Sequence, residues 1–209
     1  MRPLRLLSQL VLSALAAPSI AFAIPALHAT VPSCISLVGS YGGQAAALGQ
    51  FTVVVRDIAE NPLVGCVVQI DISNCLDLAF CADQLDPAAI VDCGYKRVSK
   101  LTTADGSVQF NLLGGSNGAG NAVTLLNGGR VFAFGLLVGT PTISAYDLDG
   151  SVGVGAGDLS VWLSDFGTGQ PYGRSDYDCN GTIGAGDLSF WLTAFGSGTM
   201  AQSCTSQCP

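Results

Sequence analysis

Two short stretches of this 209-residue chain concentrate carboxylates among glycines. One reads DLDGSVGVGAGD, from Asp147 to Asp158, and the other reads DYDCNGTIGAGD, from Asp176 to Asp187, 29 residues further on. Both place an acid at positions 1, 3 and 12 of a twelve-residue loop. A hard cation such as Ca²⁺ takes its oxygen ligands from such a loop, through side chains at positions 1, 3, 5 and 12 and a backbone carbonyl at position 7. The duplicated spacing therefore predicts two calcium sites.

Each predicted site has five ligand positions. They are Asp147, Asp149, Ser151, the carbonyl of Gly153 and Asp158 in the first loop, and Asp176, Asp178, Asn180, the carbonyl of Thr182 and Asp187 in the second. Position 6 prefers glycine for a sharp bend, and it is Gly181 in the second loop but Val152 in the first, so we expect weaker binding there. At position 8, Ile183 is expected to turn inward and pair with Val154.

Each loop leads into the same helical pattern. Apolar residues recur at i, i+3, i+4 and i+7, which places them on one face of a helix. They are Leu159, Trp162, Leu163 and Phe166 after the first loop, and Leu188, Trp191, Leu192 and Phe195 after the second. Gly167 and Gly196 are expected at the helix C-termini, where glycine adopts the left-handed conformation easily. We predict that the two helices pack face to face, with Arg174 on an exposed linker pairing with a loop acid.

Residues 30–145 predict strands rather than helices. Short alternating apolar runs, such as 51–56 and 64–72, are separated by turn-forming residues. Asp105-Gly106 predicts a tight turn between two further strands. The fold class is therefore mainly β with a small α module: an antiparallel β-sandwich followed by two loop–helix repeats.

Two segments interrupt the pattern of strands. Residues 73–95 carry three cysteines and read either as a disulfide-tied recognition loop or as a decorated loop with no binding role. The glycine-rich stretch 114–121 predicts a flexible loop.

The N-terminus has the layout of a secretory signal peptide. Arg2 and Arg5 precede an apolar run that ends in small residues at Ala21 and Ala23. We expect cleavage after residue 23, with cleavage after residue 29 as the alternative, and a secreted or cell-surface protein without a membrane span. Two of the eight basic residues are then removed while all fifteen acidic ones stay, which leaves a net charge of −9. This charge disfavours nucleic acid and anionic membranes as partners.

The residue types available for catalysis are few. The single histidine, His28, lies at the end of this leader, which excludes Ser-His-Asp and Cys-His catalysis from the mature body. A hydrolase based on two aspartates would need carboxylates outside the loops. Asp71, Asp77, Asp83, Asp86 and Asp92 are available but form no motif. We predict a protein that is not an enzyme.

Eight cysteines indicate disulfides rather than zinc, because their number is even and no C-x-x-C pair occurs. They are Cys34, Cys66, Cys75, Cys81, Cys93, Cys179, Cys204 and Cys208, the last two in a tail at 199–209. Sequence alone leaves their connectivity open. The preferred pairings are Cys75 with Cys93, and Cys179 with Cys204 or Cys208.

Residues 146–198, in which a loop and a following helix occur twice with no helix before the loop, resemble the dockerin module, which is EF-hand-like. The resemblance implies two Ca²⁺ ions, one per repeat, and docking onto a cohesin-like or other extracellular protein. Dockerins of cellulose-degrading assemblies usually carry hydroxyl residues at loop positions 10 and 11 and basic residues on the helix. This chain has alanine and glycine at those positions and no Lys or Arg on either helix.

The strand-rich region is similar to bacterial immunoglobulin-like or carboxypeptidase-regulatory-like β-sandwiches, on the strength of FTVVVRDIAENPLVGCVVQI and TTADGSVQFNL. The leading hypothesis is a non-catalytic exported protein that uses a calcium-stabilised dockerin-like module for extracellular or cell-surface assembly. The alternative is a sandwich that binds a carbohydrate or protein ligand and is anchored by the calcium-binding repeats.

Overall fold

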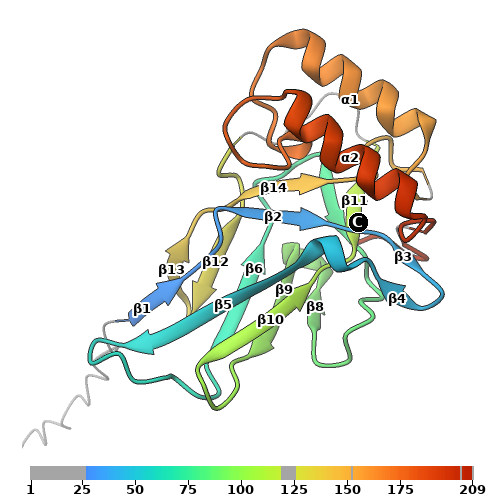
Figure 1. The fold of residues 1–209 in the computed structure, drawn as a ribbon. Coiled ribbons are helices and arrows are strands. Elements are labelled where there is room, and N and C mark those ends of the chain that lie inside the picture. The colour runs from blue at the N-terminus through green and yellow to red at the C-terminus, as the bar shows by residue number, and fades with distance from the viewer. Residues whose placement is uncertain (1–26, 119–125, 152, 203, 209) are drawn as a thin grey trace, which may run out of the picture.

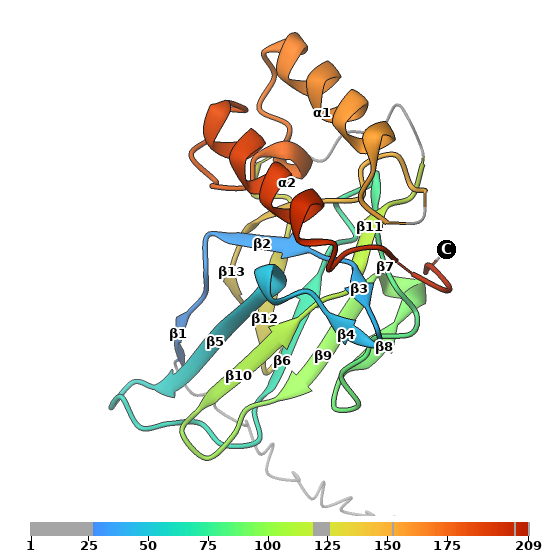
Figure 2. The ribbon, with the colours of Figure 1, turned by 45° about the vertical axis from the view of Figure 1, so that its right-hand side comes forward.

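The computed structural model describes residues 27–118, 126–151, 153–202 and 204–208. The expected signal peptide, residues 1–23, and Val152 at position 6 of the first loop lie outside the described residues. The described part of the chain is mainly β, with two α-helices that follow the strands in sequence (Figures 1 and 2). This confirms the mainly-β class with a small α module.

The strands form two larger sheets and three pairs. One larger sheet has the order β1 (Leu27–Thr30), β5 (Gln50–Asp57), β10 (Ser107–Asn111), and the other has the order β13 (Leu136–Gly139), β12 (Arg130–Ala133), β6 (Val67–Asp71), β9 (Arg97–Leu101), β8 (Ile90–Asp92). The pairs are β11 (Gly114–Ser116) with β7 (Leu78–Phe80), β14 (Thr142–Ala145) with β2 (Cys34–Leu37), and β3 (Ser40–Tyr41) with β4 (Gln44–Ala45). The 3₁₀ turns are η1 (Ala47–Gly49), η2 (Cys93–Tyr95) and η3 (Gly173–Ser175).

The two larger sheets bury one face each against a common core. Alternate residues of their strands point inward, as Val53 and Val55 do on β5 and Val68 and Ile70 do on β6, and all four are fully buried. Figure 1 shows the three-stranded sheet in front of the five-stranded one. Every pair within these two sheets is antiparallel, whereas β2 and β14 pair in parallel, which departs from the predicted all-antiparallel arrangement.

The predicted turn at Asp105-Gly106 forms. Gly106 takes a φ of +76°, and Thr103 N donates to Ser107 O at 2.8 Å. The strands that this turn joins belong to different sheets, since β9 lies in the five-stranded sheet and β10 in the three-stranded one. The turn therefore carries the chain from one layer of the core to the other.

The two segments that interrupt the strand pattern contribute strands. All three residues of β7, within 73–95, are fully buried, so this part of the segment is core rather than surface decoration. β7 pairs with β11, and the expectation of a flexible loop is wrong for residues 114–116. A Cβ at Gly114 would lie 2.5 Å from Ala79 O, so glycine there permits the close approach of the two strands. Residues 119–121 lie outside the described residues.

The helices α1 (Ala156–Thr168) and α2 (Ala185–Ser197) lie on top of the sheets and run in opposite directions (Figures 1 and 2). A second core cluster joins them to the strand-rich region. Trp162 of α1 and Trp191 of α2 are buried together with Val38 and Leu113, which come from the segments between the strands. The regions on either side of residue 145 therefore share a hydrophobic core.

Three disulfides form among the described cysteines, and they contradict both preferred pairings. They join Cys34 to Cys179, Cys81 to Cys204 and Cys93 to Cys208. Each one spans more than 100 residues, so it depends on the tertiary fold and leaves no local trace in the sequence. Cys66 and Cys75 are both buried, and burial raises the pKa of the Cys66 thiol. Three disulfides agree with an oxidising compartment.

Strand β1 overlaps the alternative cleavage position predicted after residue 29. β1 pairs with β5 from Leu27↔Asp57 to Thr30↔Val54, and Leu27 packs against the first core cluster. Cleavage after residue 29 would remove most of this strand, whereas cleavage after residue 23 would keep it. Residues 27–30 are therefore part of the folded structure.

We predict that a chain starting at Thr30 is less stable than one starting at Ile24. A backbone hydrogen bond contributes about 0.5–1.5 kcal/mol net, so loss of β1 should lower the free energy of unfolding by roughly 2 kcal/mol. For a chain of this size that corresponds to a melting temperature lower by about 4–8 °C, measured by circular dichroism. Equal melting temperatures would show that β1 contributes nothing.

Candidate metal centre

Two groups of three carboxylates converge as the loop spacing predicts. One carboxylate oxygen from each of Asp147, Asp149 and Asp158 lies within 4.8 Å of the other two, and the same holds for Asp176, Asp178 and Asp187. In each group the acids at positions 1 and 12 are buried and the acid at position 3 is exposed. Both loops therefore form a cluster of oxygen ligands that opens to solvent on one side.

The acid at position 12 organises each loop. Asp187 Oδ1 accepts hydrogen bonds from Tyr177 N at 2.7 Å and Asp178 N at 3.2 Å, and its Oδ2 accepts one from Gly184 N at 2.8 Å. Asp158 repeats this pattern with Leu148 N at 2.6 Å, Asp149 N at 3.0 Å and Gly155 N at 2.6 Å. Each carboxylate thus ties the start of its loop to the first turn of the following helix, where negative charge is favourable.

Crowding of like charges makes these clusters costly without a cation. Burial raises the pKa of Asp158, and the nearby charge of Asp149 adds to that increase although three backbone hydrogen bonds oppose it. Burial also raises the pKa of Asp176, and the charges of Asp187 and Asp178 act in the same direction. A donor set made only of oxygens suits a hard divalent cation, and Ca²⁺ accepts the irregular geometry of such loops. The residues present therefore fit a calcium ion in each loop.

A glycine before the last aspartate leaves room for the acid at position 3. A Cβ on Gly157 would lie 1.9 Å from Asp149 Oδ2, and a Cβ on Gly186 would lie 2.8 Å from Asp178 Oδ2. The carboxylate at position 3 is thus folded over the backbone at position 11. A side chain at position 11 would meet this carboxylate in the present arrangement.

The remaining predicted ligands stand beside the triads. Asn180 Nδ2 donates to Asp178 Oδ2 at 2.9 Å and its Oδ1 accepts from Thr182 N at 2.8 Å, so its side chain buttresses the acid at position 3. Ser151 N donates to Asp149 Oδ1 at 2.8 Å. Gly153 is buried at position 7 with a φ of +84°.

The bends of the two loops fall at different positions. Gly181 at position 6 has a φ of +87°, which confirms the expected use of glycine in the second loop. In the first loop, positive φ angles occur at Gly150, with +72°, and at Gly153.

Position 4 of the second loop was not predicted to matter. Cys179 stands there with a φ of +54°, where the first loop has Gly150, and its sulfur is bonded to Cys34 on β2. A residue other than glycine in this conformation costs about 1 kcal/mol. The sequence signal was a cysteine inside one of the two acidic loops, at a position that is glycine in the other copy. The disulfide holds the second loop against the sheets.

The apolar face of each helix, a stripe of residues at i, i+3, i+4 and i+7, is only partly buried. This corrects the prediction that the two helices pack face to face. Trp162 and Trp191 are buried in the second core cluster, but the outer residues of each stripe are half exposed: Leu163 at 53%, Phe166 at 52%, Leu192 at 49% and Phe195 at 51%. Phe166 stacks on Trp162 with ring centroids 5.5 Å apart, and Phe195 stacks on Trp191 at 5.4 Å. The helices also end later than expected, with Gly169 and Gly198 as left-handed caps.

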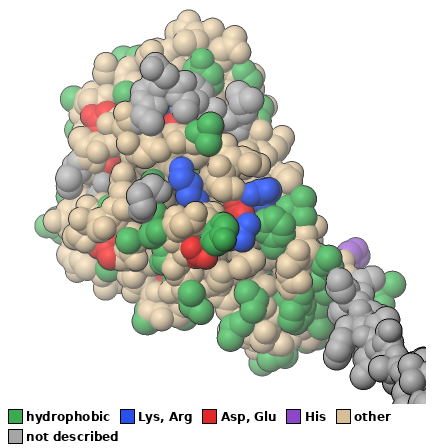
Figure 3. Space-filling view, turned by 180° about the vertical axis from the view of Figure 1, so that it is seen from behind, with side chains coloured by type: hydrophobic (Ala, Val, Ile, Leu, Met, Phe, Trp, Pro, Cys, Tyr) green, Lys and Arg blue, Asp and Glu red, His purple; other side chains and the backbone are tan. Residues whose placement is uncertain are grey.

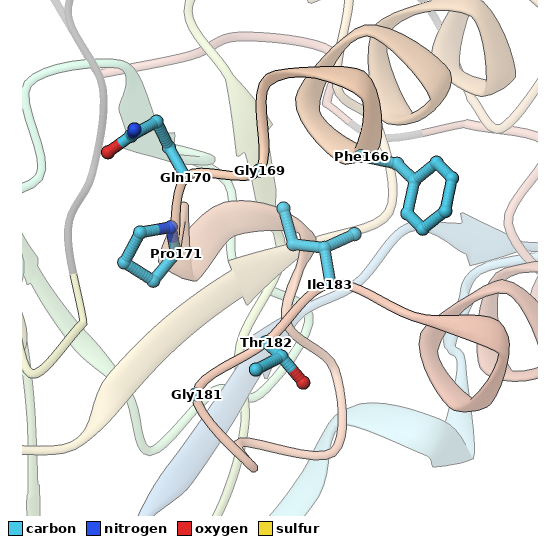
Figure 4. Close-up of a pocket in the computed structure, with 7 residues that line it drawn as sticks. All are labelled: Phe166, Gly169, Gln170, Pro171, Gly181, Thr182 and Ile183. Carbon is cyan, nitrogen blue, oxygen red and sulfur yellow. The ribbon is translucent and has the colours of Figure 1, made fainter.

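A cavity of about 330 Å³ lies beside the second loop (Figure 4). It is lined by Phe166, Gly169, Gln170, Pro171, Gly181, Thr182 and Ile183. Figure 4 shows Ile183 between Phe166 and Pro171. Val154 and Ile183 both pack inward against the second core cluster, as expected for position 8. Val154 N donates to Met200 O at 3.0 Å, and no backbone bridge joins Val154 to Ile183 among the described residues.

Arg174 is buried, contrary to its prediction as an exposed linker residue. Its guanidinium donates to both carboxylate oxygens of Asp165 on α1, at 2.7 and 2.8 Å, and to Asp77 of the strand-rich region at 3.3 Å. Burial alone would lower the pKa of Arg174, but these two carboxylates outweigh it and raise the pKa above its usual value. The ion pairs therefore link the repeats to the sheets and do not involve the loop acids.

Comparison with family models, with curated proteins and with solved structures gives no match for this chain. None of the described helices is long and apolar enough to span a membrane.

We predict that the disulfide compensates for strain at position 4. Replacing the pair with Cys34→Ser/Cys179→Ser should lower the free energy of unfolding by about 3–4 kcal/mol, because the closed loop is long. In Cys34→Ser/Cys179→Gly about 1 kcal/mol of this loss should be recovered, since glycine adopts the left-handed conformation without strain. Urea denaturation in the absence of calcium measures both values.

Gly65→Ala is the control for the cost of a left-handed side chain alone, because Gly65 has a φ of +67° and a Cβ there would meet nothing within 4 Å. Equal stability of the serine and glycine variants would contradict strain at Cys179.

Proposed function

We propose that this chain is a non-catalytic exported protein whose residues 146–198 form a dockerin-like, calcium-stabilised module for extracellular or cell-surface assembly. The single observation that carries the proposal is the pair of converging carboxylate triads, each continuous with a helix that keeps apolar side chains exposed. The triads supply a cation site, and the helices supply a surface for a partner protein.

Calcium would be held by Asp147, Asp149 and Asp158 in the first loop and by Asp176, Asp178 and Asp187 in the second, which are the residues brought together by the fold. When bound, it neutralises the repulsion within each triad and cross-links the two ends of each loop. The protein's own part is to fix the helix N-termini, because Asp158 and Asp187 each bind both the loop backbone and the first helical turn.

The partner surface that we propose is formed by Leu163 and Phe166 on α1 and by Leu192 and Phe195 on α2. Half-exposed aromatic and leucine side chains that recur on two neighbouring helices are uncommon on a monomeric surface unless they bind something. Aromatic residues are also frequent hot spots of protein interfaces. Because neither helix carries Lys or Arg, the contact would be apolar rather than based on positive charge.

The glycines at loop position 11 favour a partner different from those of cellulose-degrading assemblies. Gly157 and Gly186 leave no hydroxyl there, and each lies under the acid at position 3. A cohesin-like or other extracellular protein would therefore contact the helix face rather than these loop positions.

We predict two calcium-binding events in the mature, metal-stripped protein. Titration calorimetry should show one event lost in Asp158→Asn and the other lost in Asp187→Asn, since each change removes one charge from one triad. Asp92→Asn, an exposed acid outside the loops, serves as control and should keep both events. At a calcium concentration 100 times the dissociation constant, each site should stabilise the fold by about 2.7 kcal/mol, measured as a rise in melting temperature.

Absence of heat, together with a melting temperature that does not change on adding EDTA, would overturn the calcium part of the proposal. Binding that survives in the double variant Asp158→Asn/Asp187→Asn would place the cation elsewhere on the chain.

We predict that the helix face binds an extracellular protein from the same organism. The immobilised protein, incubated with proteins of the culture medium, should retain a partner in calcium and release it in EGTA. Since a buried aromatic hot spot contributes about 2 kcal/mol or more, Phe166→Ser/Phe195→Ser should weaken the purified complex by at least about 100-fold. Ile58→Ser, which likewise replaces an exposed apolar side chain with serine but lies far from the helices in sequence, is the control.

Retention that is independent of calcium, or equal retention by the phenylalanine variant, would contradict docking through the helices.

A further inference from the structure

The outer face of the five-stranded sheet is a second surface with an ordered pattern. Its side chains come from every other residue of β8, β9, β6, β12 and β13, and the strand register arranges them in three rows. The first row is Asp92, Arg97, Asp71, Arg130; the second is Ile90, Ser99, Gln69, Phe132, Leu137; the third contains Leu101, Val67 and Phe134. Figure 3 views the molecule from this side and shows basic side chains gathered around acidic ones, with hydrophobic side chains near them.

The first row alternates in charge across four neighbouring strands. Asp71 in its centre is fully buried, and it binds Arg97 Nε at 2.7 Å and an Arg130 nitrogen at 3.1 Å. Burial raises the pKa of Asp71, but hydrogen bonds from Ser73 and from the two arginines outweigh it and hold the pKa below its usual value. Both guanidinium groups also lie over the ring of Phe132, at 5.9 and 5.7 Å. The arginines are therefore fixed in place before any partner arrives.

The other two rows are largely apolar and open to solvent. Ile90 is 69% exposed, Leu101 59% and Leu137 54%, and Phe134 and Val67 are 48% and 39% exposed. Such a set on one sheet face is larger than the scattered apolar residues normal for a surface. A partner that covers this sheet face must present apolar groups opposite the second and third rows, and alternating charges opposite the first row.

We propose that this partner is a second copy of the chain, packed sheet to sheet about a two-fold axis that runs along the strands between β6 and β9. Rotation about such an axis brings each row opposite the same row of the second copy, with the order of its residues reversed. Asp92 then faces the Arg130 position of the partner copy, and Arg97 faces the Asp71 position. The alternating row is thus complementary to itself.

The same axis also matches the apolar rows. It sets Ile90 opposite the Phe132 position, Leu101 opposite the Val67 position, and the polar pair Ser99 and Gln69 opposite one another. A closed two-fold contact requires one patch to be complementary to itself, and this face meets that requirement where β8 faces β12 and β9 faces β6, while Leu137 and Phe134 lie at its edge. Aligned packing of two twisted sheets at about 30° is compatible with an axis along the strands.

The size of the face sets the expected affinity. Five strands about 4.8 Å apart and up to five residues long at about 3.3 Å each give a footprint of roughly 24 by 16 Å. This lies below the roughly 800 Å² per partner of a standard interface, even allowing for the roughness of the side chains. We therefore expect a reversible dimer with a dissociation constant on the order of 1–100 μM.

Sedimentation velocity of the mature, calcium-saturated protein from about 1 to about 200 μM tests this proposal. The wild type should shift from monomer to dimer across the range. Ile90→Asp should weaken association at least tenfold, because it places a charge opposite Phe132. Asp92→Arg should also weaken it, because it places two like charges opposite each other. Ile58→Asp is the matched control, since Ile58 is 81% exposed and lies outside this face, and it should dimerise like the wild type.

Three outcomes would overturn the proposal. A monomer at every concentration removes the dimer altogether. A dimer that persists in both Ile90→Asp and Asp92→Arg, with unchanged melting temperatures, removes this face from the contact. Loss of dimer in Phe195→Asp but not in Ile90→Asp would place self-association on the helices. If Ile90→Asp alone lowers the melting temperature, Leu101→Asp replaces it as the test of the apolar rows.

Discussion

The buried guanidinium of Arg174 links the two loop–helix repeats to the strand-rich region. Arg174 lies between the repeats, yet it is almost out of contact with water, and a charge in that position is tolerated only when paired. Asp165 on α1 satisfies it with two hydrogen bonds, Ser175 binds the same carboxylate at 2.6 Å, and Asp77 reaches it from the strand-rich region. Removal of one partner from such a network costs about 3–5 kcal/mol, so the position of α1 relative to the sheets is closely specified.

This junction explains why the loops and the sheets depend on each other. The second loop is tied to β2 through Cys179, and Tyr177 within that loop donates to Ala145 O at 2.9 Å while its ring stacks on Tyr146 at 4.7 Å. Tyr177 N also binds Asp187, which belongs to the second triad. Tyr177 therefore connects the second triad directly to the core. Binding of a cation at this triad would stabilise the junction as well as the loop.

Local features of the chain were predictable from sequence, whereas long-range ones were not. The spacing of the acids predicted that the three carboxylates of each loop come together, and they do, because a twelve-residue loop closes by its own geometry. The strands and the Asp105-Gly106 turn follow from period-two patterning and glycine conformation. The disulfides could not be read, because Cys34 and Cys179 are 145 residues apart and their meeting depends on the fold. Burial of Arg174 was also missed: Asp165 is nine residues away, but Asp77 is 97 residues away and only the fold brings both to the guanidinium. Gly114 was misread because a strand of glycines has no side-chain pattern, and only contact with β7 defines it.

The distribution of exposed apolar residues gives the two proposed surfaces separate roles. The helix face presents two similar aromatic and leucine pairs, while the sheet face presents alternating charge above aliphatic residues. Helices α1 and α2 lie at one end of the molecule (Figure 1), and the rows lie on the outer side of the five-stranded sheet, so one contact need not block the other. A weak dimer through the sheets would then carry two helix faces. Two linked sites bind a multivalent surface more tightly than either does alone, by a factor of roughly 10²–10⁴ where the geometry allows both to engage. If both proposed contacts form, pairing through the sheets would therefore strengthen attachment through the helix face on a multivalent surface.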